Sequence, residues 1–235
     1  MSTSTIYWSP MPVHNSGLSV MSFRAPNRVL EDVNNDIFKH NDITRCPSFT
    51  SHLKNTFVIK SPLDIQINRN YETGQWEHSY PDEILRVRDP NNQLFTLIIP
   101  YLFFTEDENV TMEVRPCFYH LSMFTNKVAV IGGDVNISSY ARPSELAFIL
   151  KPSWDELSIS FNDPLFYINF ITKKNKVKLK RFDCVDSIRR IAEQTIQIKN
   201  SRSTTVWPME KYYSIFNESG HRGKLLKLIK ENLLD

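Results

Sequence analysis

The fold of this chain is indicated most clearly by residues 45–67, RCPSFTSHLKNTFVIKSPLDIQI. Pro47 pushes the cysteine before it toward an extended backbone, and the next residues have the spacing of a short helix capped by Ser48. Two strands are predicted after it, Thr56–Lys60 and Leu63–Asn68, separated at Ser61-Pro62 because proline cannot donate to a sheet ladder. The stretch therefore predicts architecture, and it contains no arrangement that performs a known reaction.

Strand signals continue along the middle of the chain. Nine more segments carry the alternation or the β-branched and aromatic residues typical of strands: residues 83–88, 93–99, 110–115, 127–131, 135–138, 145–150, 156–161, 165–171 and 176–182. Turn-forming residues at 89–92, 132–134, 162–164 and 173–175 separate several of them. The pattern predicts a mainly β fold, an antiparallel β-sandwich or jelly-roll-like structure, with an irregular N-terminal arm and a helical C-terminal appendage.

The chain of 235 residues is long enough for one sizeable core, and we expect one domain with appendages. Residues 1–55 alternate short extended pieces with Pro, Asn and Ser, which predicts an irregular arm packed on the core. Residues 56–183 make the predicted sandwich core. Helical spacing takes over in the basic segment 184–235, where several stretches place apolar residues on one face.

Composition argues against several classes of protein. The six glycines are far fewer than the roughly sixteen expected at a usual frequency of about 7%, so a glycine-rich nucleotide cradle is not expected. The three cysteines are widely separated, which argues against a disulfide framework or a structural zinc site. The sequence shows no signal-peptide pattern and no run of about eighteen apolar residues. We therefore expect a soluble, unsecreted protein with no membrane contact.

Charge is distributed unevenly, although the formal net charge is only +2. Residues 1–170 hold 13 Lys and Arg against 19 Asp and Glu, whereas residues 171–235 hold 15 against 7. A basic segment of this kind suits a nucleic acid, an acidic surface of another subunit, or the acidic body of its own chain. The sequence leaves these partners open.

A divalent metal is one alternative, because a β-sandwich can hold iron with two histidines and a carboxylate. The candidate ligands are His40 and Asp42, which have HxD spacing, together with His78 and His120. Isolated histidines, however, are more often packing or surface residues than ligands. No cofactor is therefore predicted, and a jelly-roll-type enzyme of the iron- and 2-oxoglutarate-dependent kind stays an alternative.

Nucleophilic catalysis would need a cysteine beside a base. His52 follows Cys46 by six residues and His120 follows Cys117 by three, but the second pair would point to opposite faces of a strand. A buried structural cysteine is the simpler interpretation of Cys117. No catalytic residue is predicted, and the sequence leans against an enzyme.

Nucleic-acid binding is a further alternative. Residues 220–224, with His221, Arg222 and Lys224, have a GxxG spacing that resembles the phosphate-binding loop of KH domains. Lys178 and Lys180 would extend a basic surface along a predicted strand. The competing interpretation is a helix that ends at Gly220 and a new helix after it, with the lysines on a solvated strand face.

Four stretches of the chain resemble an uncharacterised group of tailed-bacteriophage proteins, chiefly from marine and T4-like phages. They are residues 6–10 (IYWSP), 45–49 (RCPSF), 55–64 (NTFVIKSPLD) and 161–167 (FNDPLFY). The resemblance covers most of the chain, but its motifs look structural, so no catalytic or binding residue is carried over. It implies a phage-encoded protein that acts in the cytoplasm of the infected host cell or belongs to the virion.

Together these observations favour a phage-encoded, non-catalytic binding or assembly protein whose partner is another protein or a second copy of the chain. A small-molecule-binding protein or metal-dependent enzyme of jelly-roll type is the alternative. Nucleic-acid binding through the basic C-terminal segment is a further one.

Overall fold

The computed structural model describes residues 2–11, 22–36, 45–200 and 207–234. Its strands, in chain order, are β1 (Thr3–Pro10), β2 (Asn27–Arg28), β3 (Thr56–Lys60), β4 (Ile65–Arg69), β5 (Trp76–His78), β6 (Leu85–Asp89), β7 (Leu94–Leu97), β8 (Tyr101–Phe104), β9 (Thr111–Pro116), β10 (Val128–Ile131), β11 (Gly133–Asn136), β12 (Leu146–Leu150), β13 (Glu156–Ile159), β14 (Pro164–Ile171) and β15 (Lys176–Arg181). The helices are α1 (Val29–Asp36), α2 (Pro47–His52), α3 (Met123–Lys127), α4 (Asp186–Asn200), α5 (Met209–Glu218) and α6 (His221–Glu231). The fold is mainly β with a helical C-terminal appendage, so the predicted fold class is confirmed.

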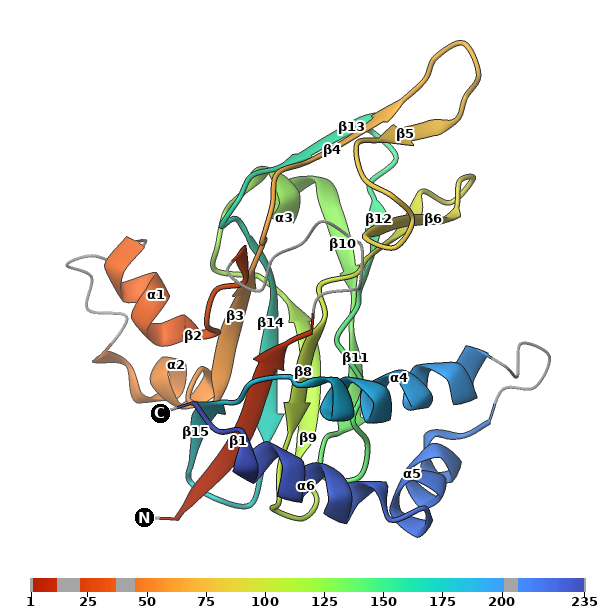
Figure 1. Ribbon diagram of the computed structural model, residues 1–235. Helices are drawn as coiled ribbons and strands as arrows, with labels where there is room; N and C mark the ends of the chain where they lie inside the picture. Colours follow the sequence, from red (N-terminus) through yellow and green to blue (C-terminus); the bar gives the residue numbers. More distant parts are fainter. Residues whose placement is uncertain (1, 12–21, 37–44, 201–206, 235) are drawn as a thin grey trace.

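The strands form sheets with the orders β15-β1-β8, β10-β12-β7-β6, β11-β9-β14-β3-β2 and β13-β4-β5. All four sheets contribute side chains to one main core. The sheet β13-β4-β5 extends away from the rest at the end of the molecule opposite α6 (Figure 1). The strand pairs of the described structure are antiparallel except for β1 and β15, which run parallel and place the first strand beside the last.

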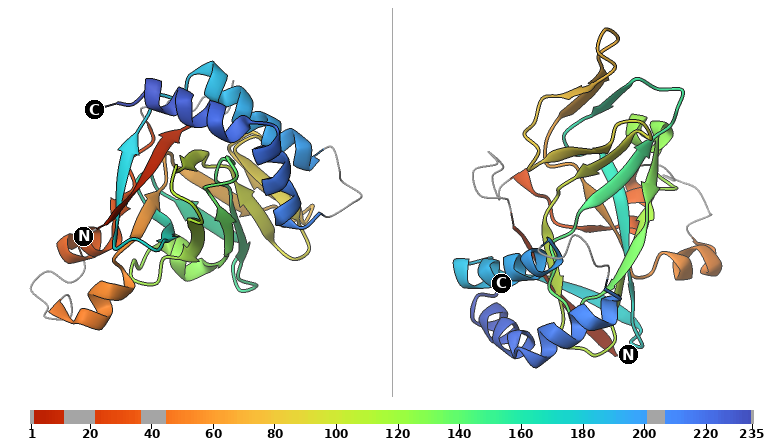
Figure 2. Two further views of the ribbon diagram at one scale, coloured as in Figure 1. Left: turned by 90° about the horizontal axis from the view of Figure 1, so that it is seen from below. Right: turned by 90° about the vertical axis from the view of Figure 1, so that its right-hand side faces the viewer.

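Alternation along the central strands builds further layers, because successive side chains of a strand point to opposite faces. In β1, Ile6 and Trp8 enter the main core, whereas Tyr7 between them packs in a second cluster under α4, α5 and α6. In β14, Phe166, Ile168 and Phe170 enter the main core. Tyr167 points to the other face and packs in a third cluster with α1. Helices therefore cover the sheets on two separate sides, as both views of Figure 2 show.

A long strand changes sheets at Gly132. Before it, β10 pairs with β12, and after it, β11 pairs with β9. A Cβ atom at Gly132 would lie 2.8 Å from the carbonyl oxygen of Val114, closer than packed atoms tolerate. The missing side chain thus lets the strand pass close to β9 where the two sheets diverge.

Three local predictions need correction. The N-terminal arm is not irregular throughout, because Thr3–Pro10 is the central strand of its sheet, held by β15 and β8. Residues 132–134 are not a turn but the point at which the strand changes sheets. The helix α2 starts at Pro47 with Cys46 at its N-cap, and not with a Ser48 cap, because proline fits the first helical position.

Candidate binding groove

A hollow lined by residues of two sheets lies where β10 and β11 part. It has a volume of about 280 Å³, and its walls come from both diverging sheets and from the start of α5. The lining residues are Arg88, Thr96, Met112, Val114, Ile131, Gly132, Gly133, Asp134, Val135, Arg142, Pro143, Ser144, Glu145, Ala147 and Met209. The volume is near the lower end of the roughly 300–1,000 Å³ typical of ligand pockets, and the mixture of apolar and polar walls is also typical.

The strand β11 presents an open backbone edge to this groove. It is the edge strand of its sheet. The amide of Ile137 donates to the carbonyl of Val110 at 3.0 Å, so these two residues form a hydrogen-bonded pair. The next pair, Asn136 with Thr111, is then a non-hydrogen-bonded pair, because the two kinds alternate along an antiparallel ladder. Accordingly, the Asn136 amide points outward and donates to the hydroxyl of Tyr213 at 3.0 Å.

By the same alternation, the N–H and C=O of Asp134 also point away from β9. Asp134 lines the groove, and among the described residues neither of these backbone groups has a hydrogen-bond partner. Tyr213 blocks the edge at Asn136 but not at Asp134. The edge of β11 is therefore left with one free donor and one free acceptor at the groove.

A buried hydroxyl in the groove wall is also without a partner. Thr96, in the middle of β7, is only 2% exposed, and its Oγ1 forms no hydrogen bond. Buried polar groups are nearly always paired, and an unpaired one costs about 1–3 kcal/mol. By contrast, the hydroxyl of Ser144 in the same wall donates to Ile99 and accepts from the Tyr101 amide. The Thr96 hydroxyl can therefore form a hydrogen bond with a ligand in the groove.

The polar rim of the groove carries an excess of positive charge on one side. Arg142 donates to Glu145 at 2.9 Å, and Arg88 lies 3.6 Å from the same carboxylate oxygen. Two guanidinium groups therefore share one carboxylate. Asp134, which also lines the groove, has no ion pair among the described residues. Arg88 and Arg142 could therefore bind an additional carboxylate from a ligand.

A second polar cluster is buried under α1, and we call it the Asp32 cluster: Asp32, Lys60, His120 and Tyr167. The Lys60 ammonium lies 2.9 Å and 3.0 Å from the two carboxylate oxygens of Asp32. One ring nitrogen of His120 lies 3.0 Å from Asp32, and the other lies 2.6 Å from the hydroxyl of Tyr167. These contacts join α1, β3, β14 and the segment that follows β9.

Every contact in the Asp32 cluster is compatible with one arrangement of protons. The Tyr119 amide donates to the Tyr167 hydroxyl, which leaves the hydroxyl proton for Nδ1 of His120. Nε2–H of His120 then donates to Asp32. Burial opposes the charge on Asp32, but the hydrogen bonds from His120 and Lys60 outweigh it and lower the pKa of Asp32 to about 2.

Cys117 lies in the same apolar surroundings as Tyr167. Burial, and then the charge of Asp32, raise the pKa of the Cys117 thiol well above its usual value. A thiol with a raised pKa is a poor nucleophile at neutral pH. The structure therefore brings Cys117 and His120 into one neighbourhood, which the sequence did not predict, but it keeps the thiol protonated.

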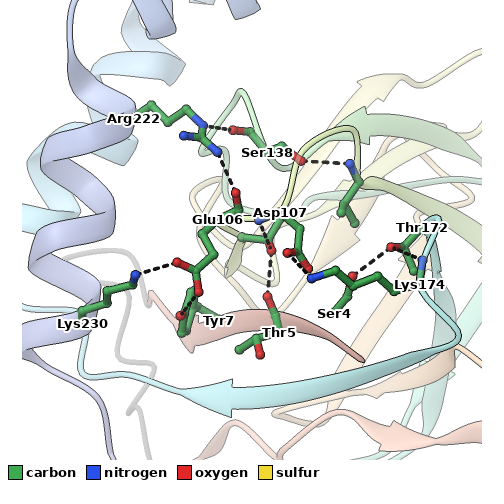
Figure 3. A network of polar contacts seen from close by, with 12 residues as sticks. Ser4, Thr5, Tyr7, Glu106, Asp107, Ser138, Thr172, Lys174, Arg222 and Lys230 are labelled. Atoms are coloured by element: carbon green, nitrogen blue, oxygen red, sulfur yellow. Dashed lines mark hydrogen bonds and ion pairs between the residues drawn. The ribbon is translucent and has the colours of Figure 1, made fainter. Parts of the chain in front are cut away.

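A third polar region joins the C-terminal helices to the body, and Figure 3 shows it. Lys230 of α6 donates to Oε2 of Glu106 at 2.6 Å, and Tyr7 of β1 donates to Oε1 at 3.1 Å. Arg222 donates to the backbone carbonyls of Ser138 and Glu106 at 2.8 and 2.9 Å. Lys230 in particular lowers the pKa of Glu106, whereas burial and then Glu106 raise the pKa of Tyr7 to about 12.

Part of the basic C-terminal segment is therefore bound to the acidic turn of its own chain. Arg222, which the sequence offered as a phosphate ligand, is committed to two carbonyl groups. Gly220 has a left-handed backbone (φ +73°) between α5 and α6, and Gly223 lies inside α6. The GxxG stretch is thus a helix junction and not a KH-like loop. His221 is half-buried, and Lys224 is exposed on α6.

The other candidate residues do not meet. Lys178 and Lys180 lie on the exposed face of β15, as the alternation predicted. His78 lies on β5, whereas His120 lies in the Asp32 cluster. His40 and Asp42 lie outside the described residues. Across the described part of the chain, no three His, Cys, Asp or Glu side chains group as metal ligands.

The groove was missed at the sequence level because its parts are distant in sequence. Thr96, Asp134 and Arg142 come from three separate segments, and each is an ordinary strand or loop residue on its own. The local signal in the sequence is Gly132-Gly133, which also predicts a turn. Two adjacent glycines before a strand also mark a close backbone approach.

Within the described ranges, no helix is both long and apolar enough to cross a membrane. No family model, no curated protein and no solved structure matches this chain.

Proposed function

We propose that the protein is a non-catalytic binding or assembly protein, and that it captures an extended segment of a protein partner along the free edge of β11. The observation that carries this proposal is the outward-pointing backbone of Asp134 at a groove, which has no hydrogen-bond partner among the described residues. An extended peptide adds to such an edge through main-chain hydrogen bonds, while neighbouring pockets select its side chains.

The chemistry of the groove specifies the partner segment. Apolar lining from both sheets, including Val114 and Ala147, accepts an aliphatic side chain. The guanidinium groups of Arg88 and Arg142, which share Glu145, accept a carboxylate. The hydroxyl of Thr96 accepts or donates one further hydrogen bond. A strand that alternates aliphatic and acidic residues fits these groups.

A phage origin, and a place in the infected host cell or in the virion, rest on the resemblance of residues 6–10, 45–49, 55–64 and 161–167. Capture of a partner strand suits an assembly protein, because main-chain pairing joins subunits without a preformed pocket on the partner. A second copy of this chain is one such partner.

The test is a binding screen of displayed peptides in which aliphatic residues alternate with random residues, followed by affinity measurements on the selected peptides. We expect enrichment of Glu or Asp at one alternating position. The variant Asp134→Pro removes the outward N–H, and an edge strand tolerates proline there. We expect this variant to lose peptide binding.

The matched control is Asp134→Ala, which keeps the N–H and should keep binding. Circular dichroism must show that both variants retain the wild-type melting transition. Amide exchange supplies an independent measurement, because the bound peptide should slow exchange at Asp134. No selected peptide, or equal binding by the proline variant, would contradict strand capture at β11.

A further inference from the structure

Two adjoining hollows lie along the outer edge of β15, on a different part of the molecule from the groove. The first has a volume of about 380 Å³ and is bounded by β15, β2 and Phe57. The second, of about 570 Å³, continues toward α2 and is bounded by Thr50, Ser51 and Lys54. The hollows share Arg28, Glu31 and Lys176, so we call them together the basic trough.

Positive charge dominates the lining of the basic trough. Arg28, Lys54, Lys176 and Lys178 face a single acidic residue, Glu31, among the described lining residues. Glu31 lies 3.8 Å from Arg28, and its side chain is 71% exposed. No hydrogen bond or ion pair in the described structure occupies the ammonium groups of Lys54, Lys176 and Lys178. Three cations are therefore available to an anionic ligand.

Two residues beside the trough cap the edge of β15 at Val177. Arg28 donates to the carbonyls of Val177 and Lys54 at 2.6 and 2.8 Å, and its guanidinium lies over the ring of Phe57. The side chain of Asn55 accepts from the Val177 amide at 3.1 Å. Both backbone groups of Val177 are thus capped. At Val177, edge protection, which is the usual role of lysines on an edge strand, is therefore provided by Arg28 and Asn55.

The lysines of β15 form a regular row. Lys176, Lys178 and Lys180 share one exposed face of the strand. Alternate residues of a strand are spaced about 6.6 Å apart, twice the rise per residue. A regular row of charges matches a polymer that carries one negative charge per repeating unit, whereas a single small anion would need converging groups.

We propose that the basic trough binds the phosphate backbone of a nucleic-acid strand. Positive grooves that follow the backbone are the common element of proteins that bind single strands. The exposed aromatic platforms that stack bases are missing from the described lining, because Phe57 is buried beneath Arg28. Binding would therefore read phosphates and not the base sequence.

A membrane surface fits these observations less well. Lipid-binding basic surfaces combine cations with apolar side chains that enter the bilayer. None of the large exposed apolar side chains of the described structure, such as Leu121 and Ile171, lines the trough. A concave surface with a row of lysines suits a chain of phosphates better than a flat layer of headgroups.

The test is fluorescence anisotropy of a labelled oligothymidine strand titrated with the full chain over a series of salt concentrations. We expect binding at low salt that weakens steeply as salt rises, because each phosphate contact releases a counterion. The double variant Lys176→Glu, Lys178→Glu should lower the affinity about tenfold or more. It should also reduce the slope of log K against log salt by about 1.4, as expected for two lost contacts to a single strand.

The matched control is Lys224→Glu, Lys227→Glu on α6, which changes the net charge by the same amount. These lysines are exposed and lie outside the trough. The control should bind oligothymidine like the wild type. Equal losses in both double variants would show an unspecific charge effect and overturn the proposal. Absence of binding at low salt, or binding only to vesicles that contain anionic lipid, would also overturn it.

Discussion

The Asp32 cluster and the groove beside β11 both hold polar groups inside an apolar fold, but they differ in how completely those groups are paired. In the Asp32 cluster, Asp32, Lys60, His120 and Tyr167 satisfy one another. In the groove, the Thr96 hydroxyl and the Asp134 backbone have no partner in the described structure. Complete pairing indicates a role in stability, whereas open hydrogen-bonding groups beside a hollow indicate a binding surface.

The difference also shows why a shifted pKa alone does not identify a functional site. The pKa of Asp32 is lowered to about 2, yet none of the hollows described above is lined by a residue of its cluster. Networks that hold a fold together perturb pKa values just as catalytic groups do. Space beside a polar group is the property that separates the two regions.

The largest effect is expected from breaking the Asp32 cluster. Asp32→Asn removes the charge that balances the Lys60 ammonium. The Lys60 side chain is only 14% exposed, so water cannot replace that charge fully. Removing one partner of a buried ion pair costs about 3–5 kcal/mol. We expect a loss of this order in the free energy of unfolding, measured by urea denaturation.

The neighbouring residue provides the control. Glu31→Gln makes the same chemical change one residue earlier in α1, at an exposed carboxylate, and should change stability by less than about 1 kcal/mol. Adding Lys60→Met to the Asp32 variant should recover part of the loss, because both charges are then gone. Similar losses for the Asp32 and Glu31 variants would remove the distinction between cluster and surface.

A smaller effect is expected from acid. The pKa of Asp32 is lowered from 3.8 to about 2 in the folded protein. The folded state therefore holds the carboxylate more strongly than the unfolded state, and this stabilisation is present above pH 4 and lost as the pH falls toward 2. Urea denaturation at several pH values should show a shallower fall for Asp32→Asn than for Glu31→Gln. Equal slopes would mean that other carboxylates cause the acid sensitivity.

The same contrast explains how far the sequence could predict the structure. The strand and helix patterns depend on local periodicity, so β3, β14, β15 and α6 were anticipated. The central position of β1 was not, because pairing with β15 joins residues more than 170 positions apart. His120 was named as a metal candidate, but its partners Asp32 and Tyr167 come from other segments, and no local pattern marks them.

Lysine patterning shows a further limit of sequence reasoning. The alternation at Lys176, Lys178 and Lys180 was visible as a solvated strand face, and the structure has it so. The sequence also offered phosphate binding by Arg222 as one alternative, but Arg222 holds α6 to the turn at Glu106. A count of basic residues cannot separate cations paired within the chain from cations left free.

The smallest expected change in stability has the opposite sign, and it tests the groove directly. Thr96→Val removes a buried hydroxyl without a partner and keeps the shape of the side chain. We expect the free energy of unfolding to rise by about 1 kcal/mol, because an unpaired polar group no longer has to be buried. We also expect the affinity for a selected peptide to fall about fivefold, which corresponds to about 1 kcal/mol.

Thr105→Val is the matched control, because the Thr105 hydroxyl is equally buried but donates to Thr5 at 2.7 Å and accepts from the Asp107 amide at 3.2 Å. There the same substitution should lower stability by about 1–3 kcal/mol and leave peptide affinity unchanged. A stabilised Thr96 variant with full affinity would show that the hydroxyl is a packing defect and takes no part in binding. Only a gain in stability together with a loss of affinity assigns it to the ligand, because a hydroxyl kept unpaired in the free protein costs stability that the bound state recovers.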